Sequence, residues 1–119
     1  MHTINIAQKL SLFSDHFNQR VIGEVNDMYV KVTKMQGEFM WHHHQHEDEL
    51  FLVVKGAITM RLRTGDVRIG EGEFFIVPKG VEHMPVAEEE AHVILLEPKS
   101  TLNTGNVRNE RTLEKLGRV

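Results

Sequence analysis

The stretch WHHHQHEDEL, residues 41–50, places four of the chain's eight histidines within five residues, followed by three acidic residues in a row. Histidine affinity tags lie at chain termini, whereas this stretch lies well inside the chain, between segments that have the pattern of strands. The histidines therefore belong to the fold. Imidazole and carboxylate side chains at this density indicate a metal site.

Residue parity decides which of these histidines can act together. In a strand, residues two apart project from the same face, so His42 and His44 form a pair while His43 points away. His44 and His46 have the same spacing, and they form the alternative pair if the strand continues further. Two imidazoles on one face supply half of a metal site.

The acidic residues that follow offer a carboxylate ligand. Glu49 opens the strand-like run ELFLVV, residues 49–54, and a turn before it would return its side chain beside the imidazoles. We expect Glu49 to be the third ligand. For Glu47 and Asp48, a solvated loop or a contact with a ligand imidazole fits better than direct coordination.

A fourth ligand must come from the second half of the chain, where His83 and His92 are the candidates. His83 follows the turn PKG, residues 78–80, and heads a strand-like run, whereas His92 lies in the middle of one. Three neutral imidazoles and one carboxylate suit divalent Fe, Mn, Ni, Co, Cu or Zn, and are too rich in nitrogen for Ca or Mg. The residues alone leave the identity of the metal open.

Period-two alternation dominates the rest of the chain and predicts its fold class. In AITMRLR, for example, apolar residues alternate with Thr59, Arg61 and Arg63, as a sheet with one wet face requires. Glycine-containing turns separate the short strands that we expect, and residues 88–90 (EEE) read as a further turn. Such a pattern favours an all-β barrel or double-sheet sandwich. The expected strands cover residues 21–25, 28–35, 39–44, 49–54, 57–63, 67–69, 74–78, 83–86 and 91–98.

The two ends of the chain differ from this pattern. Ile4, Ala7 and Leu10 have helical spacing, which predicts a short helix within residues 4–13. The polar tail from residue 99 to 119 contains an expected ordered excursion, LNTGNV, and then a segment that suits a short helix or a frayed end.

Length and composition limit the classes of protein that fit. A chain of 119 residues is the size of one domain, and we expect a single domain over residues 1–119. The net charge of -3 offers no electrostatic footprint for nucleic acid or an anionic membrane, so the partners should be small molecules or protein. Cysteine is absent, which leaves His and carboxylate as metal ligands. Without a signal-peptide pattern at the start, we expect a cytoplasmic protein.

Two separated motifs resemble the two short motifs of the cupin superfamily. The first consists of Gly37, then His42, one residue, His44, four residues, Glu49, six residues and Gly56. The second consists of Gly72, five residues, Pro78, one residue, Gly80, two residues and His83. The whole chain resembles the small single-domain cupin-2 proteins of the mannose-6-phosphate isomerase-related type. That label describes kinship of fold and does not establish isomerase activity.

The chain departs from the motifs at two points. One residue fewer separates Gly37 from His42, and Ala87 stands where the second motif usually ends in Asn. The resemblance implies a double-stranded β-helix (jelly-roll) barrel of six or eight strands and a homodimer. It also implies a divalent metal inside the mouth of the barrel, and it selects His83 over His92 as a ligand. The implied ligand set is His42, His44, Glu49 and His83.

Two classes of function fit these features. The first is a metal-dependent enzyme acting on a small molecule, with oxygenase- or isomerase-like chemistry and an unknown substrate. Its candidate acid or base groups are Glu82, next to His83, and His46, above the mouth. The alternative is a non-catalytic module that binds or senses a small ligand. A purely structural dimer with an empty site fits less well, because burying three imidazoles and a carboxylate without partners is costly.

Overall fold

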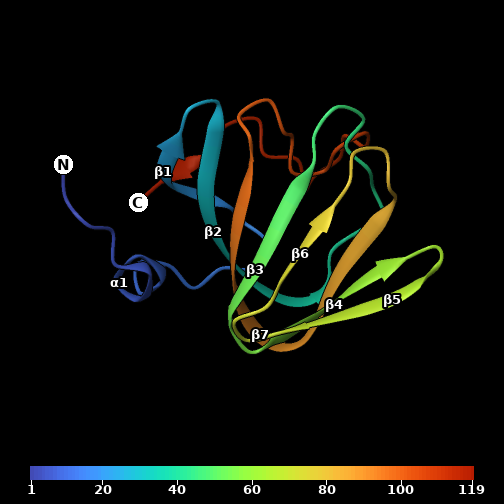
Figure 1. Ribbon diagram of the computed structural model, residues 1–119, viewed down its shortest axis with the longest axis horizontal. Coiled ribbons are helices and arrows are strands. Elements are labelled where there is room, and N and C mark those ends of the chain that lie inside the picture. The colour runs from blue at the N-terminus through green and yellow to red at the C-terminus, as the bar shows by residue number, and fades with distance from the viewer.

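The alternating segments form eight strands, and these wrap into a β-barrel in the computed structural model of residues 1–119 (Figure 1). Strands dominate the chain, and the one helix is short, so the predicted all-β class is confirmed. The elements are α1 (Ile6–Leu10), β1 (Arg20–Val25), β2 (Met28–Glu38), β3 (Glu49–Lys55), β4 (Ala57–Leu62), β5 (Gly65–Gly70), β6 (Phe74–Val77), β7 (His83–Pro98) and β8 (Gly117–Arg118).

The long strand β7 organises the barrel. Its second half lies between β2 and β3, and its first half pairs with β4 and with the end of β2, all antiparallel. The main path of hydrogen-bonded strands is β5-β4-β7-β2-β1-β8, while β3 pairs with β7 and carries β6 at its other side. One strand therefore connects all the parts of the barrel that surround the interior (Figure 1).

Residues 88–90 bend within β7, so the prediction of a turn between two strands there was wrong. Met35 of β2 pairs with Ala91, and Gly37 pairs with Ala87. Three residues of β7 thus lie opposite a single residue of β2. Such a bulge bends a strand without ending it, and the three glutamates point into solvent.

Residues 39–44 do not form the predicted strand. The only ladder contact in this segment is a bridge in which His42 and His83 exchange backbone hydrogen bonds, with N···O distances of 3.1 and 2.9 Å. The carbonyl oxygen of His44 instead accepts a hydrogen bond from the backbone N–H of Gly80 in a turn. The prediction was wrong because only Phe39 and His42 bond to β7, whereas His43 and His44 bond to the backbone of loops.

The N-terminal helix exists but is shorter than predicted. Helix α1 begins after Asn5, whose side-chain oxygen accepts a hydrogen bond from the N–H of Gln8. Its buried residue Leu10 packs with Val32 and Ile94 on the outer face of the sheet. No helix of the protein has the length and apolar character needed to cross a membrane.

The polar tail is ordered against the barrel, as predicted for its first part. Residues 109–119 form turns and the short strand β8, which pairs in parallel with β1, and no helix. Asn106 forms two hydrogen bonds with the backbone of His43, at 2.9 and 3.0 Å. This segment therefore lies directly against the histidine stretch.

The hydrophobic core fills the inside of the barrel. Eleven buried apolar side chains form its main cluster, contributed by every strand from β2 to β7. A cluster of His42, His44, Glu49 and His83 lies at one end of this core, where His83 contacts Phe51. The core residues are Met35, Phe51, Val53, Ile58, Met60, Ile69, Val77, Ala87, Ala91, Val93 and Leu95.

A substitution at Gly105 tests the close packing of the tail. Gly105 has a φ of 57°, and a Cβ there would overlap the carbonyl oxygen of His43. Gly105→Ala is expected to lower the free energy of unfolding by roughly 3 kcal/mol, because overpacking adds to the cost of a left-handed alanine. Urea unfolding followed by Trp41 fluorescence measures this loss.

Gly72→Ala is the matched control. Gly72 has a φ of 76° but has open space where a Cβ would stand. Only the conformational cost of about 1 kcal/mol is expected there. Equal losses for the two variants would contradict the close contact between Gly105 and His43.

Candidate metal centre

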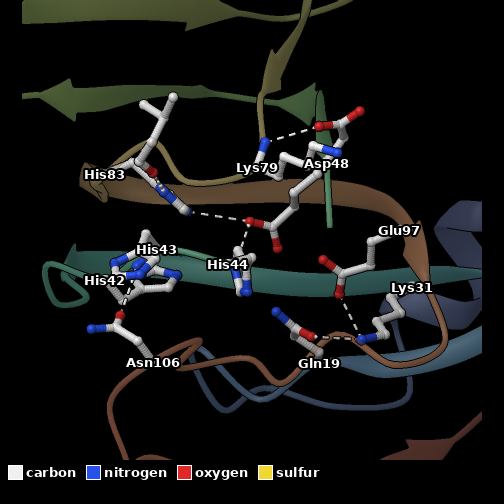
Figure 2. Close-up of polar contacts among 12 residues, drawn as sticks. Gln19, Lys31, His42, His43, His44, Asp48, Lys79, His83, Glu97 and Asn106 are labelled. Atoms are coloured by element: carbon white, nitrogen blue, oxygen red, sulfur yellow. Dashed lines mark hydrogen bonds and ion pairs between the residues drawn. The ribbon is translucent and has the colours of Figure 1, made fainter. Parts of the chain in front are cut away.

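Three segments bring the four predicted ligands together. Glu49 begins β3 and His83 begins β7, and the backbone bridge to His83 places His42 beside it, with His44 two residues further on. All four side chains are buried, with at most 3 % of any of these residues exposed. One potential ligand atom from each lies within 4.8 Å of the others, and Figure 2 shows His42, His44 and His83 near one another.

The hydrogen bonds of His42 and His83 orient both rings for coordination. Nδ1 of His42 donates to the carbonyl oxygen of Met40, and Nδ1 of His83 donates to that of Val81, both at 2.9 Å. A backbone carbonyl only accepts, so the proton lies on Nδ1. The lone pair of Nε2 then faces the cluster, as in histidines that ligate metals.

His44 provides an independent test of whether a metal ion fits. Neither ring nitrogen of His44 has a hydrogen-bond partner, although the side chain is buried. Its Nε2 lies 3.1 Å from Oε1 of Glu49, and Nε2 of His83 lies 3.3 Å from the same oxygen. A divalent ion would satisfy these converging lone pairs, because an orphaned buried nitrogen is otherwise costly. The donor set therefore fits a metal.

Electrostatics keep His42 and Glu49 in the protonation states that bind metals. Burial, assisted by the neighbouring His83, lowers the pKa of His42 to about 4. Burial acts in the opposite direction on Glu49, but the adjacent side chains of Glu97, His44 and His83 outweigh it and hold the pKa of Glu49 well below its usual value. A neutral imidazole and an ionised carboxylate result at neutral pH.

A buried polar network lies behind Glu49. The side chains of Lys31 and Glu97 are fully buried, and Nζ of Lys31 donates to Oε1 of Glu97 at 2.6 Å and to Oε1 of Gln19 at 3.2 Å. Burial and the adjacent carboxylate of Glu49 raise the pKa of Glu97 well above its usual value, against the opposing charge of Lys31. Figure 2 shows Lys31 and Gln19 on the same side of the cluster.

A small cavity adjoins the cluster. Its volume is about 20 Å³, which is room for about one water molecule. The walls are mostly apolar, with a few polar groups, and no titratable residue other than His42 and Glu49 lines them. The lining residues are Phe17, Gln19, Thr33, Met35, Phe39, His42, Glu49, Phe51, Pro85 and Asn103.

The C-terminal tail covers one side of this cavity. The rings of Phe17 and Phe39 stack with their centroids 5.2 Å apart, and the guanidinium of Arg111 lies 5.6 and 5.4 Å from the two ring centroids. Arg111 also donates to the backbone carbonyl oxygens of Glu38 and Phe39. These contacts hold the tail across the mouth of the barrel.

The rival histidines lie outside the cluster. His46 is exposed, so the structure brings His42 and His44 together rather than the alternative pair. His92 is half-buried, and its Nε2 lies 2.9 Å from Glu90. His43 is not among the residues of the cluster.

The acidic residues near the cluster have other partners. Glu47 accepts a hydrogen bond from Ser100, and Asp48 accepts one from the N–H of Lys79. Glu82 is exposed, and its carboxylate lies 3.4 Å from Arg63. Neither Glu82 nor His46 lines the cavity, and a catalytic role for them stays a prediction.

The sequence interpretation missed the buried network of Lys31, Glu97 and Gln19. A lysine that alternates with valines in a strand indicates a solvent face, yet here Lys31 and Thr33 face the interior. Val32 instead lies on the outer face, where Leu10 of α1 covers it. The only sequence signal for a buried Lys31 was the apolar face of helix α1. A helix that covers the outer face of a strand allows both faces of that strand to be buried.

The fold and the site define a β-barrel protein with a buried candidate metal centre of three histidines and one glutamate. Residues 28–97, more than half of the chain, match the family described as Cupin domain (Cupin_2). The chain therefore belongs to the cupin family, and the predicted cupin fold is confirmed. The mannose-6-phosphate isomerase-related subtype has no such support.

Proteins similar to the chain include two solved structures and one curated protein. A cupin-2 domain-containing protein from Shewanella frigidimarina is 43 % identical, with a TM-score of 0.80, over 81 % of this chain and 94 % of that one. Protein NMB1881 from Neisseria meningitidis is 28 % identical, with a TM-score of 0.76, over 82 % of this chain and 100 % of that one. The uncharacterized protein YdbB of Bacillus subtilis is 35 % identical over 63 residues, which span 52 % of this chain and 56 % of YdbB.

The lowered pKa of His42 predicts how the stability of the metal-free protein depends on pH. The unfolded chain takes up a proton near the ordinary pKa of 6.5, whereas the folded state resists protonation until about pH 4. Stability from this group is therefore fully present above pH 6.5 and falls as the pH drops toward 4, by at most about 1.4 kcal/mol per pH unit.

Urea unfolding of chelator-treated protein between pH 7 and pH 4.5 measures this dependence. A His42→Gln variant serves as the comparison, because it removes only this titration. The variant is expected to lose stability less steeply over that range than the wild type. Parallel curves for the two proteins would contradict a depressed pKa at His42.

Proposed function

We propose that the protein is a metal-dependent enzyme that acts on a small molecule by oxygenase- or isomerase-like chemistry. The observation that carries the proposal is the convergence of four buried ligand atoms beside a cavity. His42, His44, Glu49 and His83 would hold one divalent Fe, Mn, Ni, Co, Cu or Zn ion. When bound, such an ion supplies a Lewis acid and a charge that orients a substrate.

The residues around the cluster favour chemistry that is protected from bulk water. Phe17, Phe39 and Phe51 line the cavity, and the stacked pair of Phe17 and Phe39 closes one side of it. Apolar walls lower the local dielectric and strengthen the effect of any charge inside. Such surroundings support a reactive centre better than a site for transient ion storage.

A non-catalytic binding or sensing module is the second candidate. It is favoured by a specific observation: apart from His42 and Glu49, no residue that lines the cavity can exchange a proton. The absence of a separate acid or base leaves ligand capture as the simpler use of the site. Product formation that depends on added metal would support the enzyme, whereas saturable ligand binding without turnover would support the module.

Metal content is the direct test of the centre. Elemental analysis of protein purified without chelator or affinity tag is expected to find about one divalent metal ion per chain. His44→Ala and His83→Ala should each lose it, because every one of these ligands contributes to a buried site. A chelator should lower the Tm of the wild type, and added metal should restore it.

His92→Ala is the matched control for these variants. His92 lies on β7, like His83, but pairs with Glu90 outside the cluster. This variant should keep the metal at the level of the wild type. A wild type that contains no metal and takes up none when it is offered would contradict the proposed function.

The same proposal includes a homodimer in the cytoplasm. The absence of cysteine supports a reducing compartment. For the dimer, strand β6 is the supporting feature, because it lies at a sheet edge and leaves Phe74 and Ile76 61 % and 47 % exposed. Exposed apolar side chains on an edge strand suit the same side chains of a second copy across a two-fold axis.

Charge placed on this patch tests the dimer. Ile76→Glu is expected to convert a dimeric wild type to a monomer, because the introduced carboxylates would face each other across the interface. Val25→Glu is the control, since Val25 is 57 % exposed at the end of β1, away from β6. Light scattering coupled to size-exclusion chromatography measures the mass. A wild type that elutes as a monomer would contradict the dimer.

A further inference from the structure

Gln19 is a polar residue that lines the cavity, and a buried neighbour fixes the orientation of its side-chain amide. Its side-chain amide lies 3.2 Å from Nζ of Lys31. An ammonium group only donates hydrogen bonds, so the amide oxygen of Gln19 must face Lys31, and its NH₂ group must face the other way. Figure 2 shows that nitrogen turned away from Lys31, toward the side where His44 lies.

The orientation of Gln19 is held by a rigid partner. Lys31 is fully buried, so it cannot swing into solvent, and Glu97 fixes its ammonium at 2.6 Å. Gln19 itself is only 9 % exposed, at the edge of the cavity. A flipped amide would place its NH₂ against the ammonium, which is repulsive in a low-dielectric interior.

The amide nitrogen of Gln19 is the free directional donor of the cavity. It forms no hydrogen bond with another group of the protein. The amide of Asn103 is oriented toward the tail, because it donates to the carbonyl oxygen of Arg111 and accepts from the N–H of Leu113. The hydroxyl of Thr33 faces the carbonyl oxygen of Lys34 at 3.4 Å. The other residues that line the cavity, apart from His42 and Glu49, have apolar side chains.

We propose that Gln19 donates a hydrogen bond to an oxygen of the ligand in this cavity, and that the ligand is a small carboxylic acid. The inference rests on the proposed function, because the divalent ion of the cluster would attract the anion. A carboxylate has two oxygens in one plane, so one can face the cluster while the other accepts from Gln19. The volume of about 20 Å³ restricts the ligand to the smallest anions.

Formate, the smallest carboxylate, is the probe. The protein is loaded with Co²⁺, the bound Co²⁺ is counted by elemental analysis, and formate is titrated while the visible Co²⁺ spectrum is recorded. Gln19→Leu is expected to keep the Co²⁺ and to raise the Kd for formate about tenfold, the loss typical of one hydrogen bond to a charged group.

Two further variants make the result specific. Gln36→Leu is the matched control, because Gln36 is exposed on β2 and does not line the cavity, and its Kd for formate should equal that of the wild type. Gln19→Glu keeps an oxygen for Lys31 and removes the donor, so it should weaken formate binding as well, with less risk to the fold.

The possible failures are distinguishable. A wild type that takes up no Co²⁺ overturns the proposed function and, with it, this inference. Co²⁺ bound at one per chain with no response to formate overturns the carboxylate ligand class. Formate bound equally well by the wild type, Gln19→Leu and Gln19→Glu, all holding Co²⁺, overturns the role of Gln19 alone.

Discussion

The backbone bridge between His42 and His83 is the contact on which the candidate centre depends. Two reciprocal hydrogen bonds join the beginning of β7 to a segment that does not itself form a strand. They place one ligand from each half of the chain side by side, with ring centroids 4.3 Å apart. Because these bonds involve only backbone groups, the placement does not require an ion to be present.

Charge inside the barrel is arranged in layers behind this bridge. Glu49 faces the three imidazoles, Glu97 lies behind it, and Lys31 lies behind Glu97. Removing either Lys31 or Glu97 would leave the other fully buried polar side chain without its partner, which is costly. The network therefore constrains the position of the ligand carboxylate, and through Lys31 it also constrains the amide of Gln19.

The C-terminal tail connects the fold to the accessibility of the site. Gly105 and Asn106 pack against His43, and Arg111 lies over the stacked rings at the mouth. Polar contacts with exposed partners are weaker than buried apolar packing and open at lower free energy. The tail forms part of the cavity wall through Asn103, and the contacts of Arg111 hold the tail over the mouth. The size of the cavity therefore depends on these contacts.

The sequence by itself determined the all-β class, the two motifs, and the spacing that leaves either His42 with His44 or His44 with His46 as the paired imidazoles. These are local properties, because alternation and motif spacing depend on residues close together in the chain. The tertiary structure alone decided how the four candidate ligands converge and that His46 is exposed. It also decided the bend in β7, the burial of Lys31 and the orientation of Gln19. Each of these depends on contacts between distant segments, such as α1 covering β2 or the tail crossing the mouth, and no local pattern encodes such contacts.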